Sequence, residues 1–244
     1  MNNFIGVFDS GIGGVSVLKE LKKIMPNYNY YYLSDSKNMP YGGKEESELK
    51  TIIDQNIKHL ISKGIKLIVI ACNTATSIYI DEARRKYKDI IFVGIEPAIK
   101  VVYDNKIDEV LVLATYNTLN NKRVNNLLNK YNVKKMIKYP CIGLADLIEK
   151  KDMKSIDYYF LYHFKEFKNI KSVLLGCTHY SLIKTKFEEY FKDAKIIDGN
   201  MGISNVVKKY VEKIGLKEGN SEIIFEDTSN DDNKYKLFYD ILNN

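Results

Sequence analysis

The chain has 244 residues, of which 45% are hydrophobic and 28% are charged, values typical of a globular protein with one large domain or two smaller ones. Its net charge of +6 arises from lysines scattered along the sequence, which indicates a solvated surface and not a nucleic-acid-binding patch. No apolar run approaches the ~18 residues needed to span a bilayer. We therefore expect neither nucleic acid nor a membrane as a partner.

The cysteines indicate the cellular compartment. The chain contains three of them, Cys72, Cys141 and Cys177, and it begins without a secretory pattern. An odd number of cysteines in such a chain favours free thiols in a reducing cytoplasm. No Cys-x-x-Cys pair or His/Cys cluster has the spacing of a zinc site, so we expect no metal.

The first half of the chain alternates short apolar runs with segments of helical spacing. A Gly-rich loop over residues 9–14 follows the first run, and a turn over 40–43 precedes the second helical segment. Gly64 fits the C′ position that ends this second helix. We expect strands over 3–8, 28–33, 65–71 and 90–95, and helices over 15–25, 45–63 and 76–87.

The second half repeats this rhythm. We expect strands over 109–114, 134–139, 172–175 and 194–197, and helices over about 119–130, 144–149, 158–167 and 182–191. Three predicted strand ends correspond between the halves, with offsets of 106, 105 and 102 residues: Asp9 with Thr115, Cys72 with Cys177, and Glu96 with Asp198. This regularity indicates an internal duplication.

The tail is expected to differ from both halves, with a helix over 203–214, a strand over 222–226 and a closing helix over 232–242. Strands that alternate with helices form parallel sheets covered on both faces. We therefore predict an α/β fold with two similar parallel-sheet lobes related by duplication and an active site in the cleft between them. The predicted lobes are 1–97 joined by 206–244, and 98–205.

Cys72 and Cys177 each follow a near-identical apolar run, so both are expected between the end of a strand and the start of a helix. The thiolate is the reactive form of cysteine, and backbone N–H groups at a helix N-terminus lower the thiol pKa from about 8.5. A single cysteine is more often a packed core residue. Two at matched positions favour a catalytic pair, whereas Cys141 has no counterpart and is interpreted as structural.

Three further features lie near the predicted strand ends. The loop over 9–14 has backbone N–H groups that suit an anion such as a carboxylate, although a tight turn alone is the alternative. Its glycine spacing is not the dinucleotide fingerprint, and Asp9 disfavours a phosphate. His179 lies two residues after Cys177, where it suits acid-base chemistry. Glu149 lies near the start of the helical region that residues 144–149 are expected to open, where an acid also complements the helix dipole.

Five motifs follow one another along the chain: DSGIGG at 9–14, PYG at 40–42, ACNTA at 71–75, GIEPA at 94–98 and GCTHY at 176–180. Together they resemble the glutamate racemases of the aspartate/glutamate racemase family, in that family's order. The resemblance covers residues 4 to about 200, and the tail fits more loosely. The Thr-His pair after Cys177 is similar to the glutamate enzymes and not to the aspartate racemases.

The resemblance implies racemisation of free glutamate without pyridoxal phosphate, metal or any other cofactor, with D-glutamate supplied for bacterial peptidoglycan. One thiolate would remove the α-proton from one face, and the opposite thiol would deliver a proton to the other. A closed site with fixed N–H donors would stabilise the carbanion. The resemblance also implies a homodimer as one assembly, although the sequence reveals no interface.

Carried over position by position, the resemblance implies a role for each motif residue. Cys72 and Cys177 would be the two bases, with Asp9 assisting the first, and with His179 and Glu149 on the side of the second. The amino and α-carboxylate groups of the substrate would be held by Ser10, Asn73, Thr74 and Thr178. The distal carboxylate would be held by Tyr41, Gly42 and Thr118, with Pro40 and Thr115 beside them.

Two positions depart from the family pattern, since Ser181 and Ile142 stand where a proline is usual. Alternatives to a glutamate racemase also remain. A racemase of aspartate or another amino acid on the same scaffold would be revealed by turnover of L-aspartate. A carboxylate-binding protein without catalysis would bind an amino acid tightly and leave it unchanged. A thiol hydrolase or decarboxylase would need only one cysteine.

Overall fold

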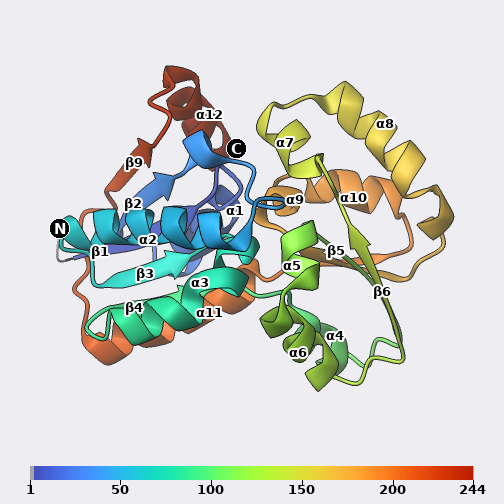
Figure 1. Ribbon diagram of the computed structural model, residues 1–244, viewed down its shortest axis with the longest axis horizontal. Coiled ribbons are helices and arrows are strands. Elements are labelled where there is room, and N and C mark those ends of the chain that lie inside the picture. Colours follow the sequence, from blue (N-terminus) through green and yellow to red (C-terminus); the bar gives the residue numbers. More distant parts are fainter. Residues whose placement is uncertain (1–2, 244) are drawn as a thin grey trace.

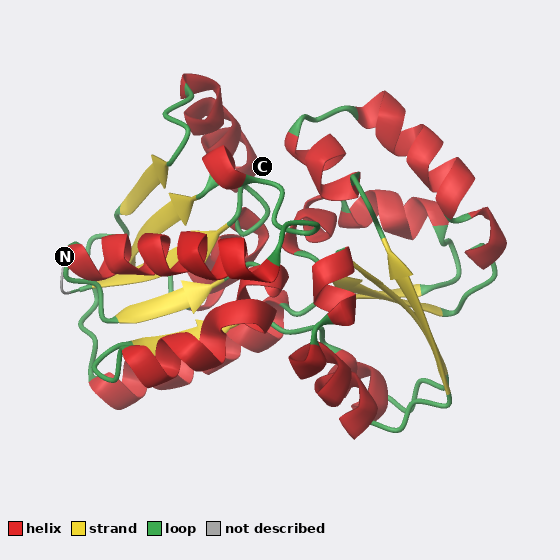
Figure 2. Ribbon diagram, viewed as in Figure 1, coloured by secondary structure: helices red, strands yellow, loops and turns green. Residues whose placement is uncertain are grey.

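Two parallel β-sheets lie side by side in the computed structural model of the chain, and helices flank each of them (Figure 1, Figure 2). The structure describes residues 3–243, so the outermost ends of the predicted ranges 1–97 and 206–244 lie outside it. The arrangement confirms the predicted α/β class with two parallel sheets. No helix in this described part of the chain is long and apolar enough to cross a membrane.

The first sheet contains β1 (Phe4–Asp9), β2 (Asn29–Ser34), β3 (Leu67–Ile70), β4 (Ile91–Gly94) and β9 (Ile223–Asp227). Its strands pair in parallel in the order β4-β3-β1-β2-β9. Successive residues of a strand point to opposite faces, so Val7 and Phe8 of β1 belong to two separate cores. One face is covered by α1 (Val15–Ile24), α11 (Asn200–Ile214) and α12 (Asp232–Asn243), and the other by α2 (Glu46–Ser62) and α3 (Asn73–Lys86). We call this sheet with its five helices the first lobe.

The second sheet contains β5 (Glu109–Ala114), β6 (Lys135–Pro140), β7 (Ser172–Gly176) and β8 (Lys195–Ile197), paired in parallel in the order β6-β5-β7-β8. One face is covered by α4 (Ile99–Asp104), α5 (Tyr116–Asn120) and α6 (Lys122–Lys130). The other face is covered by α7 (Leu144–Glu149), α8 (Met153–His163), α9 (Thr178–Leu182) and α10 (Lys184–Tyr190). We call this sheet with its helices the second lobe. Short 3-10 turns lie over Ser36–Asn38 and Lys165–Phe167.

The two sheets repeat the same strand order, because β4-β3-β1-β2 corresponds strand by strand to β8-β7-β5-β6. In each lobe the second strand lies on one side of the first strand and the third strand lies on the other side. The direction in which strands are added therefore reverses between β1 and β3 in the first sheet and between β5 and β7 in the second. Ligands of open α/β sheets bind at such points, outside the carboxyl ends of the strands. Cys72 follows β3 and Cys177 follows β7, so each thiol lies beside one of these points.

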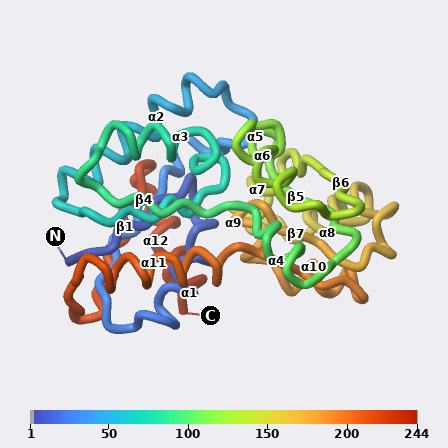
Figure 3. The backbone as a smooth tube through the Cα atoms, turned by 90° about the horizontal axis from the view of Figure 1, so that it is seen from below, coloured from blue at the N-terminus to red at the C-terminus, as the bar shows by residue number. Residues whose placement is uncertain are grey.

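The chain crosses between the lobes twice, once from β4 to α4 and once from β8 to α11 (Figure 3). The crossings touch, since a Cβ on Gly199 would lie 2.8 Å from the carbonyl oxygen of Glu96. A side chain at this position would therefore push the two segments apart. The residue ranges that we predict for the two lobes, 1–97 with 206–244 and 98–205, remain a prediction.

The helices differ from the sequence-based prediction mainly at their ends. The predicted helix 76–87 already begins at Asn73, and the predicted helix 158–167 begins at Met153, where the Asp152 carboxylate accepts a hydrogen bond from the Ser155 N–H. The predicted helices 119–130 and 182–191 are each two helices, α5 with α6 and α9 with α10. Capping groups determine these ends more strongly than the spacing of apolar residues. Gly64 has φ +80, as its predicted C′ position requires.

Candidate active site

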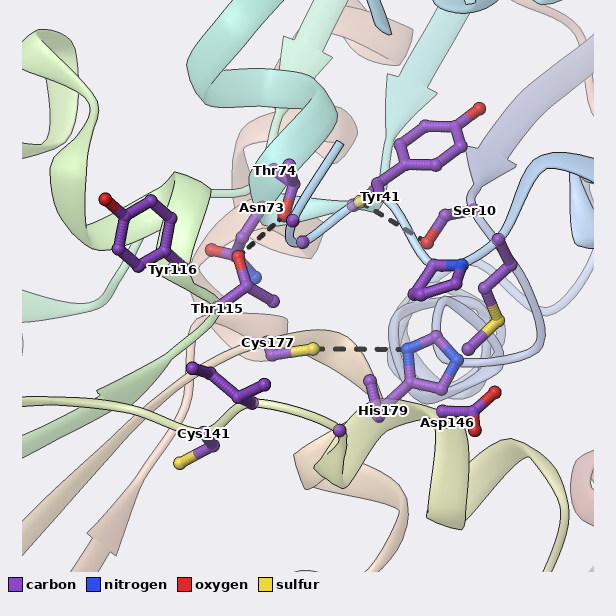
Figure 4. A pocket seen from close by; sticks show the side chains of 18 of the residues that line it. Ser10, Tyr41, Asn73, Thr74, Thr115, Tyr116, Cys141, Asp146, Cys177 and His179 are labelled. Atoms are coloured by element: carbon purple, nitrogen blue, oxygen red, sulfur yellow. Dashed lines mark hydrogen bonds between the residues drawn. The ribbon is translucent and has the colours of Figure 1, made fainter. Parts of the chain in front are cut away.

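A cavity of about 440 Å³ lies where the carboxyl ends of the two sheets face each other (Figure 4). Its size suits a small metabolite. Eleven of the predicted site residues line it: Ser10, Pro40, Tyr41, Gly42, Cys72, Asn73, Thr74, Thr115, Cys177, Thr178 and His179. The other three, Asp9, Thr118 and Glu149, are buried behind the lining. The structure therefore gathers the predicted site residues around one space.

Cys72 is the N-cap of α3, and its Sγ accepts a hydrogen bond from the Ala75 N–H at 3.5 Å. The thiol also donates to the Ser10 hydroxyl at 3.6 Å. Burial and, to a smaller extent, the nearby Asp9 carboxylate raise the pKa of this thiol to about 12, although the Ala75 N–H opposes them in part. The N–H donor at the helix N-terminus thus acts in the expected direction, but the expected net lowering of the pKa is wrong for Cys72, because desolvation of the thiolate outweighs this donor.

Cys177 lies between β7 and α9 on the opposite wall of the cavity from α3 (Figure 4). Its Sγ lies 4.0 Å from Nδ1 of His179, a residue in the first turn of α9. Both side chains are buried, yet both line the cavity. The predicted neighbourhood of this thiol and this imidazole is thus present.

Glu149 contacts the His179 ring on the side away from Cys177. It is the last residue of α7, so the expectation that it lies near a helix start and complements the dipole there is wrong. Nε2 of His179 lies 2.7 Å from Glu149 Oε2, while the other carboxylate oxygen, Oε1, lies 2.5 Å from Lys234 Nζ. Burial would lower the pKa of His179, but hydrogen bonds with Cys177 and Glu149 raise it well above its usual value. Burial opposes ionisation of Glu149 too, yet its bonds to His179 and Lys234 lower its pKa to about 2. The imidazole is therefore protonated and the carboxylate ionised.

The Gly-rich loop does bind an anion, but that anion belongs to the protein. The Ile12 N–H donates to Glu149 Oε2 at 3.1 Å across the boundary between the lobes. A Cβ on Gly11 would lie 2.7 Å from the same oxygen, and one on Gly13 would lie 2.8 Å from Cγ of the His179 ring. Glycine at both positions allows Glu149 and His179 to approach this closely.

Asp9 connects the loop to the second lobe. Its Oδ1 accepts a hydrogen bond from the Gly11 N–H at 2.9 Å, and its Oδ2 accepts one from the Thr178 hydroxyl at 3.0 Å. Burial raises the pKa of this carboxyl group, although the positive charge of His179 opposes the effect. Asp9 thus lies near Cys72 and also contacts Thr178, the residue after Cys177, although it does not line the cavity.

Three threonines form a cluster on another wall. The hydroxyl of Thr74 shares hydrogen bonds with Thr115 at 2.9 Å and with Thr118 at 3.2 Å. Thr118 is fully buried and supports the other two from behind. Beside them, the Oδ1 of Asn73 is buried without a hydrogen-bond partner among the described residues. Such an oxygen is costly unless a ligand supplies a donor.

The turn that contains Tyr41 and Gly42 bridges the lobes. The Asn117 side chain of α5 donates to the Tyr41 carbonyl oxygen at 3.0 Å, and the Asn117 N–H donates to that of Gly42 at 3.0 Å. The Tyr41 hydroxyl donates to Asp35 and points away from the cavity (Figure 4). Only other atoms of Tyr41 are therefore available to a ligand.

Sequence reasoning missed part of the lining: Met39, Gly43, Tyr116, Cys141, Ile142, Gly143, Ala145 and Asp146. Cys141, interpreted as structural, is buried and also reaches the cavity. Lys234 was missed as well, because no local pattern connects a lysine in the tail with Glu149. Among residues 3–243, no three or more His, Cys, Asp or Glu side chains are grouped so that they could hold a metal ion.

The comparison with known families decides the identity. Residues 13–201 match the family described as Asp/Glu/Hydantoin racemase. The chain belongs to this racemase family. Among curated members, the glutamate racemase of Clostridium botulinum (strain Alaska E43 / Type E3) is 42% identical, with 91% of each chain covered. That of Clostridium acetobutylicum is 40% identical, again with 91% of each chain covered.

The same relation holds among solved structures of the racemase family. The glutamate racemase of Francisella tularensis subsp. tularensis SCHU S4, solved in complex with D-glutamate, superimposes with a TM-score of 0.86. It is 29% identical, and the match covers 100% of this chain and 94% of that one. The recognition of the glutamate racemases from five short motifs is thereby confirmed.

The buried ion pair between Glu149 and His179 leads to a testable prediction. Glu149→Gln is expected to lower the free energy of unfolding more at about pH 6 than at about pH 3, where part of the carboxylate's contribution has already been lost. The folded-state pKa of Glu149 is about 2, below its usual 4.5, so its carboxylate stabilises the fold above pH 4.5 and this contribution is lost as the pH falls toward 2. Urea unfolding at both pH values measures the difference. Glu166→Gln, at an exposed position, is the control. An equal difference at the two pH values would contradict the assignment.

Proposed function

We propose that this protein interconverts L- and D-glutamate by moving the α-proton between Cys72 and Cys177. In each direction one thiolate takes the proton from Cα, the electron pair of the C–H bond stays on Cα, and the opposite thiol donates its proton. Inversion of a stereocentre by proton transfer needs two such groups, one on each face. The observation that carries the proposal is that equivalent strand ends of the two lobes bring two thiols to one cavity.

The charges around the thiols support this chemistry. At neutral pH the Cys72 thiol is protonated, because its pKa is about 12, so it can donate a proton. A substrate brings an α-ammonium group, and a positive charge nearby favours the thiolate. We therefore expect substrate binding to activate Cys72 as a base. On the other face, the protonated His179 is placed to hold the Cys177 sulfur.

The cavity lining offers matching partners for the polar groups of glutamate. We propose that the unpartnered Oδ1 of Asn73 accepts a hydrogen bond from the α-ammonium group. Hydroxyl groups of Ser10, Thr74 and Thr178 are proposed for the α-carboxylate. The distal carboxylate is assigned to Thr115 and to the backbone of Tyr41 and Gly42. Pro40 shapes this end, and Thr118 supports it from behind.

The use of the product, the cellular location and the assembly of the protein are also proposals. Family analogy supports a role for the D-glutamate product in peptidoglycan, a cytoplasmic location and a homodimer as the assembly. The reaction as written uses thiols alone and calls for no cofactor.

Incubation of the pure protein with L-glutamate in D2O tests the function. Optical rotation is expected to decay to zero while one deuterium per molecule enters at Cα, because the proton delivered to the second face comes from a thiol that exchanges with solvent. A parallel incubation with L-aspartate tests the alternative substrate. Racemisation of aspartate alone would overturn the substrate assignment, and tight binding without turnover would favour the non-catalytic alternative.

A further inference from the structure

Lys234 lies in the first turns of α12, in the tail, and takes no part in the cavity lining. Its side chain is only 18% exposed, and its Nζ lies 2.5 Å from Oε1 of Glu149, whose own side chain is 5% exposed. A largely buried ammonium group at this distance is unlike the exposed lysine pairs of the surface, which contribute little. The contact therefore calls for an explanation.

The helix that carries Lys234 is fixed to the first lobe. Phe238 of α12 stacks on Phe225 of β9, with ring centroids 4.1 Å apart, and also packs against Tyr32 of β2. Glu149 belongs to α7 of the second lobe, beside the core residue Ile148. The ammonium group thus reaches from one lobe to a carboxylate of the other.

The contact continues to a thiol. Glu149 uses Oε1 for Lys234 and Oε2 for both His179 and the Ile12 N–H. Nδ1 of His179 then faces Cys177 at 4.0 Å. Removal of the ammonium group would leave Oε1 of a buried carboxylate without its charged partner, which is a strongly unfavourable state that rotation of the carboxylate would relieve. Such a rotation would break the alignment of the imidazole.

We propose that Lys234 is a positioning residue for Cys177, acting through Glu149 and His179. The proposal rests on the proposed function, in which Cys177 exchanges a proton with Cα. Since Lys234 belongs to the first lobe, Glu149 keeps both its oxygens engaged only when the lobes are apposed around the cavity. Proton transfer at Cys177 is thereby coupled to that apposition of the lobes.

Primary isotope effects with α-deuterated L- and D-glutamate test the proposal. At equilibrium the two enantiomers are equally populated, so any variant must lose the same factor of kcat/KM in both directions. The primary isotope effect measured with one enantiomer reports how far abstraction of the α-proton from that enantiomer limits the rate, which kcat/KM alone does not show. The enantiomer that Cys177 deprotonates is the one whose α-proton still exchanges in D2O with Cys72→Ala.

In Lys234→Met, we expect kcat/KM to fall by about 10²-fold in both directions, as a displaced acid-base group does. The isotope effect is expected to rise for the enantiomer that Cys177 deprotonates, because that step becomes slower. It is expected to fall for the other enantiomer, because reprotonation by Cys177 then limits the rate. Lys234→Arg is expected to recover most of the activity and the parent isotope effects, since it keeps the charge.

Asp240→Asn is the matched control, because Asp240 lies on the same helix and pairs with Lys151 at 4.0 Å, a contact that also joins α12 to the second lobe. It is expected to retain the parent isotope effects. Unchanged kcat/KM in Lys234→Met, or a loss with unaltered isotope effects, would overturn the proposal. Should Lys234→Met fail to fold, Lys234→Gln replaces it and must show the same opposite changes. A parent protein that does not racemise glutamate would instead overturn the proposed function.

Discussion

Cys72→Ala and Cys177→Ala are each expected to lower kcat/KM for racemisation by at least about 10³-fold, since each removes the acid-base group that we propose for one face of Cα. Both thiols line the cavity, and each lies at the carboxyl end of the equivalent strand of its lobe. Circular dichroism at a wavelength where glutamate absorbs follows the reaction from either enantiomer. Each variant is also expected to retain slow exchange of the α-proton with solvent for one enantiomer, and the two variants should differ in which.

Cys141→Ala is the control for the loss of a buried thiol near the site. Cys141 donates only a weak hydrogen bond, to the Tyr139 carbonyl oxygen at 3.8 Å, and burial raises its thiol pKa well above the usual value. Its activity is expected to stay within about tenfold of the parent. Racemisation at the parent rate by either Cys72→Ala or Cys177→Ala would exclude the two-thiol mechanism.

Gly13→Ala is expected to cost about 10²-fold in kcat/KM and about 1–3 kcal/mol in the free energy of unfolding. The added methyl group would lie 2.8 Å from Cγ of the His179 ring, so the imidazole must move, and its contacts with Cys177 and Glu149 must change with it. Steady-state kinetics and urea unfolding measure the two effects separately.

Gly202→Ala provides the matched control for Gly13→Ala. Gly202 lies in α11, and a Cβ there would meet nothing within 4 Å. Alanine favours a helix over glycine by about 0.5–1 kcal/mol, so this variant should be slightly more stable and fully active. Full activity of Gly13→Ala would mean that the position of His179 is unimportant for the reaction.

The sequence predicts the positions of the strands well, because apolar runs are a local pattern. Most of the predicted site residues that line the cavity belong to short local motifs. Short apolar runs rich in β-branched residues, such as the one before Cys72, favour buried strands, and residues that directly follow parallel strands of one sheet lie at the same edge of it. The resemblance to the glutamate racemases, and not this reasoning, predicts that Ser10, Asn73 and Thr178 share one site, since they follow strands of two different sheets.

The groups behind the lining could not be predicted in this way. Lys234 reaches Glu149 only through the placement of the tail, and the Gly-rich loop binds that carboxylate instead of a ligand. Both contacts depend on long-range packing between lobes. The raised pKa of Cys72 has the same origin, since burial is a property of the whole fold and the sequence shows only the neighbouring helix.

The repeated strand order has a consequence for how such a site can arise. A single ancestral half that paired with its own copy would present two identical thiols across a twofold axis, one on each side of a shared ligand. Fusion of the two copies into one gene frees each to mutate alone. Asp9 now stands where the other copy has Thr115, and the residue two positions after the thiol is Thr74 in one copy and His179 in the other. Under such an origin, two thiols that began in identical surroundings would now have different neighbours while they remain opposite each other.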